Sequence, residues 1–257
     1  MWKEIAFDFN GRNYVVVGAS SGMGRNIASN LAKSGANVLA IARNEKRLAD
    51  LQKSYPERIR ISSLDVLSAD SNAWKKVLDE FVEVMGKCHG GVYTAGIGGQ
   101  TFLRRFDSDN AHKIIDTSLW GMIGFFSNFI KKKYVEAGSS FVSFASVSSY
   151  NGQKGAIAYS AAKSAVKISV KSIAKEISRD MHRINSISPG WVETDMTGES
   201  ILKDAERSFA DMVAMHRLGI GSPEDVSGTV LFLLSDAARW ITGTDIVVDG
   251  GYLLGID

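Results

Sequence analysis

Short apolar segments alternate with longer amphipathic segments along the whole chain, and this alternation constrains the fold more than any other feature of the sequence. The segments typical of strands are residues 14–17, 37–42, 60–66, 89–94, 140–145, 183–187 and 245–248. The segments typical of helices are residues 27–33, 44–53, 71–84, 107–118, 119–135, 158–180 and 223–234. Strands that alternate with helices imply right-handed crossovers and a parallel sheet. The pattern therefore predicts an α/β fold with a mostly seven-stranded parallel sheet and helices on both faces.

The composition limits the number of domains and the classes of partner. No linker, repeat or low-complexity tract interrupts the 257 residues, so we predict one domain over residues 1–257. The formal net charge of +2 gives no electrostatic reason to expect nucleic acid or an anionic membrane as partner. The single cysteine, Cys88, fits a reducing compartment. We see no secretory signal and no apolar stretch of the ~20 residues that cross a bilayer, so we expect a cytoplasmic protein.

A glycine-rich turn connects the first predicted strand to the first predicted helix. Its spacing is G-x-x-x-G-x-G, not the G-x-G-x-x-G of the general dinucleotide fingerprint. Glycine lets the backbone approach a cofactor closely, and the unpaired N–H groups of a helix start bind pyrophosphate. The turn therefore predicts a dinucleotide site in a doubly wound, Rossmann-like fold. The cofactor-binding residues predicted here are Gly18, Ser20, Ser21, Gly22, Met23 and Gly24.

The end of the second predicted strand carries the residues that distinguish two nicotinamide cofactors. An acidic residue there binds the ribose 2′-hydroxyl of NAD, whereas an arginine accommodates the 2′-phosphate of NADP. This chain has Arg43, which is able to pair bidentately with a phosphate, followed by Asn44. The sequence therefore favours NADP(H) without excluding NAD(H). Asp65 and Val66, which end the third predicted strand, are expected to meet the adenine.

Tyr159 and Lys163 are four residues apart in a helical pattern, so they share one face of the helix. A free tyrosine has a pKa of about 10, and a nearby ammonium lowers that pKa because it favours the phenolate. Ser146 follows the fifth predicted strand, at the sheet edge where ligands bind in doubly wound folds. The Tyr-x-x-x-Lys spacing alone carries little information. Together with Ser146 and the glycine turn, it predicts a proton-transfer site.

In combination these segments resemble the short-chain dehydrogenase/reductase family in its ~250-residue single-domain form. The general look is that of the 3-oxoacyl-thioester reductases and related sugar or alcohol dehydrogenases. The matching segments occur in family order and cover almost the whole chain. They are Gly18–Gly24, Asp65-Val66, Ala95-Gly96, Ser146, Tyr159-Ser-Ala-Ala-Lys163, Pro189-Gly190 and Thr242-Gly-Thr-Asp-Ile-Val-Val-Asp-Gly-Gly251.

The resemblance implies a role for each matched residue. Ser146 would hydrogen-bond the substrate oxygen, and Tyr159 would be the general acid in reduction and the base in oxidation. Lys163 would bind the nicotinamide ribose and tune Tyr159. The remaining cofactor contacts are implied for Thr94, Ala95, Gly96, Pro189, Gly190, Val192 and Thr194, with Thr194 near the nicotinamide amide.

Three positions depart from the family pattern. Val17 stands where the family commonly has threonine, and Thr94 replaces the asparagine of the usual Asn-Ala-Gly. Aligned on Leu119-Trp120-Gly121, Ser118 occupies the position of a catalytic asparagine that helps hold a water between the lysine and solvent. Serine is shorter, so we expect Ser118 to alter the proton relay without abolishing activity.

Other features of the sequence leave alternatives open. Residues 191–215 form either a surface helix with loose ends or a lid over the substrate. The four histidines, His89, His112, His182 and His216, show no metal-ligand spacing, so no metal site is predicted. The resemblance also implies a homo-oligomer: helices around 100–137 and 157–180 would form a dimer face, and the carboxyl-terminal end would contribute to a tetramer.

The sequence thus predicts an oxidoreductase that transfers a hydride between NADP(H) and a small-molecule ketone or secondary alcohol, with Tyr159 as general acid/base. An alternative from another class is a dinucleotide-binding sensor or subunit without turnover, suggested by the changes at Val17, Thr94 and Ser118. The substrate and the direction of the reaction are not encoded in these motifs.

Overall fold

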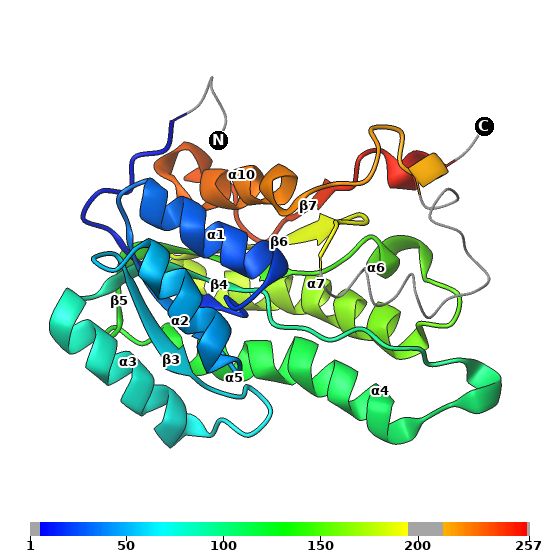
Figure 1. Ribbon diagram of the computed structural model, residues 1–257, viewed down its shortest axis with the longest axis horizontal. Helices are drawn as coiled ribbons and strands as arrows, with labels where there is room; N and C mark the ends of the chain where they lie inside the picture. The colour runs from blue at the N-terminus through cyan, green and yellow to red at the C-terminus, as the bar shows by residue number, and fades with distance from the viewer. Residues whose placement is uncertain (1–5, 195–212, 256–257) are drawn as a thin grey trace.

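The computed structural model describes residues 6–194 and 213–255, which form a parallel sheet covered by helices on both faces (Figure 1). The strand order is β3-β2-β1-β4-β5-β6-β7, and every neighbouring pair of strands is parallel. The strands are β1 (Asn13–Val17), β2 (Asn37–Ala42), β3 (Ile59–Ser63), β4 (Cys88–Tyr93), β5 (Val135–Phe144), β6 (Arg183–Pro189) and β7 (Asp245–Val248). This order confirms the predicted doubly wound fold and its seven-stranded sheet.

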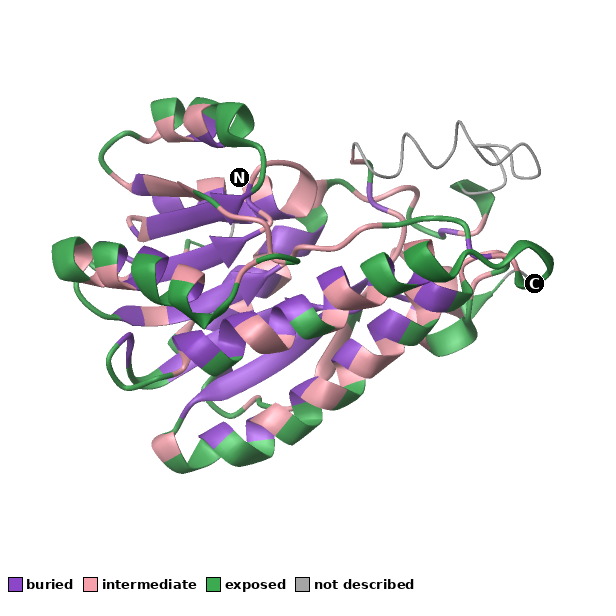
Figure 2. Cartoon of the chain, turned by 90° about the horizontal axis from the view of Figure 1, so that it is seen from below, coloured by how far each residue is buried: buried purple, intermediate pink, exposed green. Residues whose placement is uncertain are grey.

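Two apolar layers lie between the sheet and the helices. Strand β1 is buried throughout, and its side chains alternate between the layers: Tyr14 and Val16 enter one, while Val15 and Val17 enter the other. The helices of the first layer are α1 (Gly22–Lys33), α2 (Glu45–Ser54) and α10 (Pro223–Leu234). Those of the second are α3 (Ser71–Met85), α5 (Gly121–Phe129) and α7 (Ile157–Ile177). Accordingly, the strands are mostly buried, while the helices show one buried and one exposed side (Figure 2).

The helix boundaries follow the predicted signals at two places that position the site. Helix α2 begins after Asn44, whose side chain accepts a hydrogen bond from the Arg47 amide. Helix α1 ends at Lys33, and Gly35 has a φ of +89°, the left-handed conformation that glycine adopts readily after a helix. Both ends agree with the predicted boundaries.

Two predicted boundaries are wrong. The helix expected over 119–135 ends at Phe129, and Val135 instead begins strand β5. The chain turns through three consecutive lysines, Lys131 to Lys133, which give the helix no apolar face to bury. The strand expected to reach Val66 ends at Ser63, so Asp65 and Val66 lie in the turn that follows it.

The segment from 107 to 129 is one interrupted helix, whereas the sequence suggested two. It consists of α4 (Ser108–Ile115), a π-helical turn at Asp116–Trp120 and α5. In the π turn the Gly121 amide bonds to the Asp116 carbonyl, five residues back. A short helix that the sequence did not predict, α6 (Ser148–Asn151), follows β5. Most of the predicted lid at 191–215 falls on residues 195–212, which lie outside the described residues.

Candidate functional site

A pocket of about 410 Å³ opens at the carboxyl ends of the central strands, where the strand order reverses beside β1. Every predicted site residue lines it except Ser118. Those that line it are Gly18, Ser20, Ser21, Gly22, Met23, Gly24, Arg43, Asn44, Asp65, Val66, Thr94, Ala95, Gly96, Ser146, Tyr159, Lys163, Pro189, Gly190, Val192 and Thr194. Residues far apart in the sequence are therefore brought to one place.

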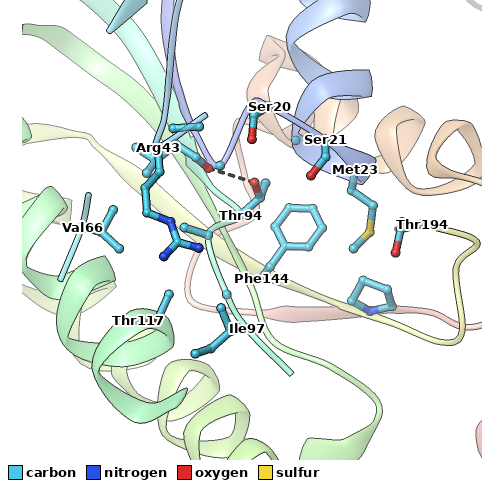
Figure 3. A pocket seen from close by; sticks show the side chains of 18 of the residues that line it. Ser20, Ser21, Met23, Arg43, Val66, Thr94, Ile97, Thr117, Phe144 and Thr194 are labelled. Carbon is cyan, nitrogen blue, oxygen red and sulfur yellow. Dashed lines mark hydrogen bonds between the residues drawn. The ribbon is translucent and has the colours of Figure 1, made fainter. Parts of the chain in front are cut away.

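The glycine turn is packed too tightly for side chains at its ends. A Cβ on Gly24 would clash with the carbonyl oxygen of Gly18 and with Oγ1 of Thr94. Gly18 has a φ of +90°, and a Cβ there would meet the same threonine. The Thr94 hydroxyl donates to the Val17 carbonyl over 2.8 Å, the bond dashed in Figure 3. The Thr94 side chain thus holds the turn against strand β1. Because Gly18 and Gly24 have no side chains, the backbone of the glycine turn itself faces the pocket.

The start of helix α1 has the properties of an anion site. Ser21 is the N-cap, yet its side chain makes no capping hydrogen bond. No acidic residue lies in the first turn to offset the partial positive charge of the helix. Ser21, Gly22 and Met23 line the pocket, so the first-turn amides are available to a phosphate there.

Two arginines line the pocket where the chain leaves strand β2. The Arg43 side chain lies between Val66 and Thr94 in Figure 3, and its Nη1 is 3.9 Å from Asp65 Oδ2. Arg47, which sequence reasoning missed, also lines the pocket. The sequence did contain a signal for Arg47. It lies in the first turn of α2, where a positive side chain interacts unfavourably with the positive end of the helix dipole, and a bound phosphate would offset that unfavourable interaction.

Another side of the pocket is formed by the chain leaving β6. The Gly190 amide donates to the Val248 carbonyl over 3.0 Å, and a Cβ on Gly190 would lie 2.8 Å from the Cα of Asp249. Four residues later, Thr194 Cγ2 lies 3.1 Å from where a Cβ on Gly22 would be. This segment therefore runs from the sheet edge to the glycine turn. Three further lining residues that the sequence did not reveal are Ile97, Thr117 and Phe144.

Tyr159, Lys163 and Ser146 meet at the inner end of the pocket. Lys163 is 5% exposed, and its Nζ donates to the Phe144 carbonyl over 2.8 Å and lies 5.6 Å from the centroid of the Tyr159 ring. Burial lowers the pKa of Lys163 to about 8. Burial also raises the pKa of Tyr159, and the hydrogen bond with Ser146 opposes that shift. The expectation of a lowered Tyr159 pKa is therefore wrong for the protein alone, because desolvation outweighs the hydrogen bond with Ser146.

Ser146 is the first member of a chain of hydrogen bonds that leads away from Tyr159. The Ser148 amide donates to Ser146 Oγ over 3.2 Å, and the two hydroxyls are 3.3 Å apart. The Ser148 hydroxyl donates in turn to Gln153 Oε1 over 3.0 Å. These contacts fix the Ser146 side chain in the pocket.

Ser118 lies just behind the pocket wall. It is 1% exposed, and its Oγ has no hydrogen-bond partner among the described residues. A Cβ on Gly96 would lie 3.7 Å from Ser118 Oγ and 3.4 Å from Lys163 Nζ, so the two polar groups face the same side of Gly96. The π turn holds Ser118 here, and the Tyr93 hydroxyl donates to the Thr117 carbonyl within it over 2.6 Å.

The other candidates lie apart from this pocket. Cys88 is buried, and burial raises the pKa of its thiol to about 12. No group of three or more His, Cys, Asp and Glu side chains suited to a metal occurs in residues 6–194 and 213–255. No helix in the same residues is long and apolar enough to span a membrane.

Comparison with known proteins agrees with this geometry. The family model described as enoyl-(acyl carrier protein) reductase matches residues 18–253. The chain is 30% identical to an L-rhamnose 1-dehydrogenase (NADP(+)) of Thermoplasma acidophilum, covering 97% of this chain and 99% of that one. It is 29% identical to the 3-oxoacyl-(acyl-carrier-protein) reductase FabG of Thermotoga maritima, over 95% of this chain and 98% of that one.

A solved structure, described as ElxO with NADP bound, superposes with a TM-score of 0.85 at 26% identity, over 95% of this chain and 99% of that one. These matches extend over nearly the whole chain and include the pocket. The resemblance found in the motifs is thereby confirmed: the chain belongs to the short-chain dehydrogenase/reductase family of oxidoreductases.

Proposed function

We propose that the protein transfers a hydride between NADP(H) and a ketone or secondary alcohol, with Tyr159 as the general acid/base. One observation carries the proposal: Ser146, Tyr159 and Lys163 meet in a pocket that Arg43 and Arg47 also line, and Arg43 follows strand β2, three positions along the sheet from the strand β5 that Ser146 follows. The names of the rhamnose dehydrogenase and of the NADP-bound structure support the choice of cofactor.

The pocket residues fit a dinucleotide phosphate from end to end. The bare backbone at Gly18 and Gly24 leaves room for the pyrophosphate beside the α1 amides. Arg43 and Arg47 would hold the 2′-phosphate, and Asp65 and the adjoining turn would meet the adenine. The bound cofactor supplies or accepts the hydride, a chemistry that protein side chains lack.

The polar side chains at the inner end would move the proton. In reduction the Tyr159 hydroxyl would protonate the oxygen of the substrate, and in oxidation its phenolate would take the proton back. Ser146 would bind the same oxygen, since its hydroxyl lies beside Tyr159. The Lys163 ammonium would bind the nicotinamide ribose and favour the phenolate of Tyr159. Ser118 would take part in the route by which Lys163 exchanges protons with solvent.

The chemical class of substrate follows from the family and the site. The relatives named above act on a sugar and on an oxoacyl thioester, both of which react at a carbonyl or carbinol carbon. We therefore propose a small-molecule carbonyl or alcohol as substrate. A panel of ketones, oxoacyl thioesters, sugars and secondary alcohols, assayed at the nicotinamide absorbance with NADP(H) and NAD(H), tests this. Turnover with NADP(H) on at least one compound is expected. Tight NADPH binding with no turnover on any of them would favour the non-catalytic sensor or subunit.

We further propose a cytoplasmic homo-oligomer, a dimer or tetramer. Large apolar side chains are exposed at four places: Trp120 on the π turn, Ile168 on α7, Trp240 before strand β7 and Leu254 after it. Apolar surface of this kind supports association between copies. Light scattering during gel filtration should give a mass of two or four chains, and a mass of one chain would contradict this part of the proposal.

A further inference from the structure

Residues 191–194 form the segment that closes the nicotinamide side of the pocket, and a histidine outside the pocket lining holds this segment in place. Val192 and Thr194 of this segment line the pocket, and Thr194 packs against the glycine turn at Gly22. The position of the segment therefore sets how closely the two sides of the pocket approach each other. Its attachment to the rest of the protein determines that position.

Among the described residues, two sets of hydrogen bonds attach the segment. The first is a backbone pair: the Gly221 amide donates to the Trp191 carbonyl over 3.0 Å, and the Glu193 amide donates to the Gly221 carbonyl over 2.8 Å. The second uses a side chain. The Trp191 amide donates to Nε2 of His216 over 2.9 Å, and His216 is 4% exposed. Because Nε2 accepts this bond, the imidazole carries its proton on Nδ1.

The carboxyl-terminal residues in turn hold His216. Its ring lies 4.9 Å from the ring of Tyr252, with 32° between their planes. The two residues that follow His216 are hydrogen-bonded to the residues on either side of Tyr252. The Leu218 amide donates to the Gly250 carbonyl, and Arg217 Nη2 donates to the Gly255 carbonyl, each over 2.9 Å. Asp249, next to this stretch, also packs directly against Gly190: a Cβ on Gly190 would lie 2.8 Å from the Cα of Asp249.

We propose that His216 is a positioning residue for the nicotinamide half of the cofactor site, supported by residues 249–255. The inference rests on the proposed cofactor-binding function. Without the imidazole acceptor, the partly buried Trp191 amide would be left without its partner, and the segment would shift to satisfy it. The shift would be felt by Thr194 and Val192, and not by the arginines at the other end of the pocket.

Three variants separate a positioning role from a structural one. His216→Phe keeps a ring against Tyr252 and removes the acceptor, whereas His216→Gln keeps an acceptor atom, Oε1, at about the reach of Nε2. His182→Phe is the matched control, because His182 is also buried, at 5% exposed, and precedes β6 at the end remote from Pro189. Dissociation constants are measured for NADPH and for 2′,5′-ADP, which carries only the adenosine half of the cofactor.

The proposal expects His216→Phe to weaken NADPH about tenfold, in line with a lost hydrogen bond, while its affinity for 2′,5′-ADP stays unchanged. His216→Gln and His182→Phe should bind both compounds as the wild type does. NADPH affinity unchanged in His216→Phe, or affinities for both compounds lowered equally, would overturn the proposal. If His216→Phe fails to fold, Tyr252→Leu provides the same comparison and should weaken NADPH alone. A wild-type protein that binds neither compound would contradict the proposed function instead.

Discussion

The ammonium of Lys163 donates a hydrogen bond to the Phe144 carbonyl over 2.8 Å at a position where the residue is only 5% exposed. One carbonyl does not replace the water that a lysine loses on burial, so the pKa of Lys163 falls to about 8. The protein holds this buried charge beside Tyr159, where the proposed mechanism uses it for proton transfer and where its burial costs stability.

The rate of carbonyl reduction should therefore fall as the pH rises through about 8. In the proposed mechanism, reduction needs the Tyr159 hydroxyl protonated and the Lys163 ammonium charged. The lysine is the first of the two to lose its proton, since burial raises the pKa of Tyr159. The profile of kcat/KM against pH reports the groups of the free enzyme. A descending limb near pH 8 is expected, and a flat profile to pH 10 would show that the Lys163 charge is dispensable.

Replacing the lysine should stabilise the fold. Lys163→Met removes a buried ammonium, and the free energy of unfolding at pH 7 should rise by about 1–3 kcal/mol while activity is lost. In the wild type this group makes stability rise between pH 8 and 10.5, because the folded lysine releases its proton before the unfolded one does. Denaturant unfolding across that pH range should show the rise in the wild type and its loss in the variant. A less stable Lys163→Met protein would contradict the argument.

The choice of cofactor should depend on Arg43. Arg43→Asp is expected to weaken NADPH about tenfold or more and to affect NADH much less, because only NADPH carries the 2′-phosphate. Lys46→Asp is the control for net charge, since Lys46 lies on the same helix as Arg47, is exposed and does not line the pocket. Equal losses for both cofactors in Arg43→Asp would remove this residue from the 2′-phosphate site, and the same comparison with Arg47→Asp would test its neighbour.

The serine at position 118 should be replaceable by the asparagine of the family. Ser118→Asn is expected to preserve or raise kcat, because a longer polar side chain reaches farther toward Lys163. Ser118→Ala should lower kcat about three- to tenfold if the hydroxyl belongs to the proton relay. Ser149→Ala, which deletes another buried hydroxyl without a partner among the described residues, should change neither rate nor stability much. A large loss of kcat in Ser118→Asn with unchanged stability would count against the assignment.

Most of the fold could be predicted because each strand carries its own signal. The fully buried run at Asn13–Val17 and the glycine turn after it are local patterns, and so is the Asn44 cap. The helix expected through Val135 was wrong because no glycine or proline stands between α5 and β5 to mark where the helix ends. The π turn at Asp116–Trp120 has no local signal, since it depends on the Tyr93 hydroxyl reaching Thr117 across the fold.

The residues that line the pocket could be predicted where they belong to the glycine turn or to the Ser146, Tyr159 and Lys163 motif. Gly18, Gly24, Ser146, Tyr159 and Lys163 all reach the pocket as expected. The direction of the Tyr159 pKa shift could not be predicted, because helix spacing gives the distance to Lys163 and says nothing of burial. The contact that His216 makes could not be predicted either, since its partner Trp191 is 25 residues away in sequence.

Tyr159→Phe tests the central claim most directly. The variant removes the proton donor and leaves the ring, so NADPH should bind as tightly as to the wild type while kcat for the best carbonyl of the panel falls by at least about 10²-fold. Fluorescence titration of NADPH and the turnover assay are run on the same preparation. Loss of turnover with retained binding is the result predicted for a general acid. A Tyr159→Phe protein that turns over at the wild-type rate would contradict the account.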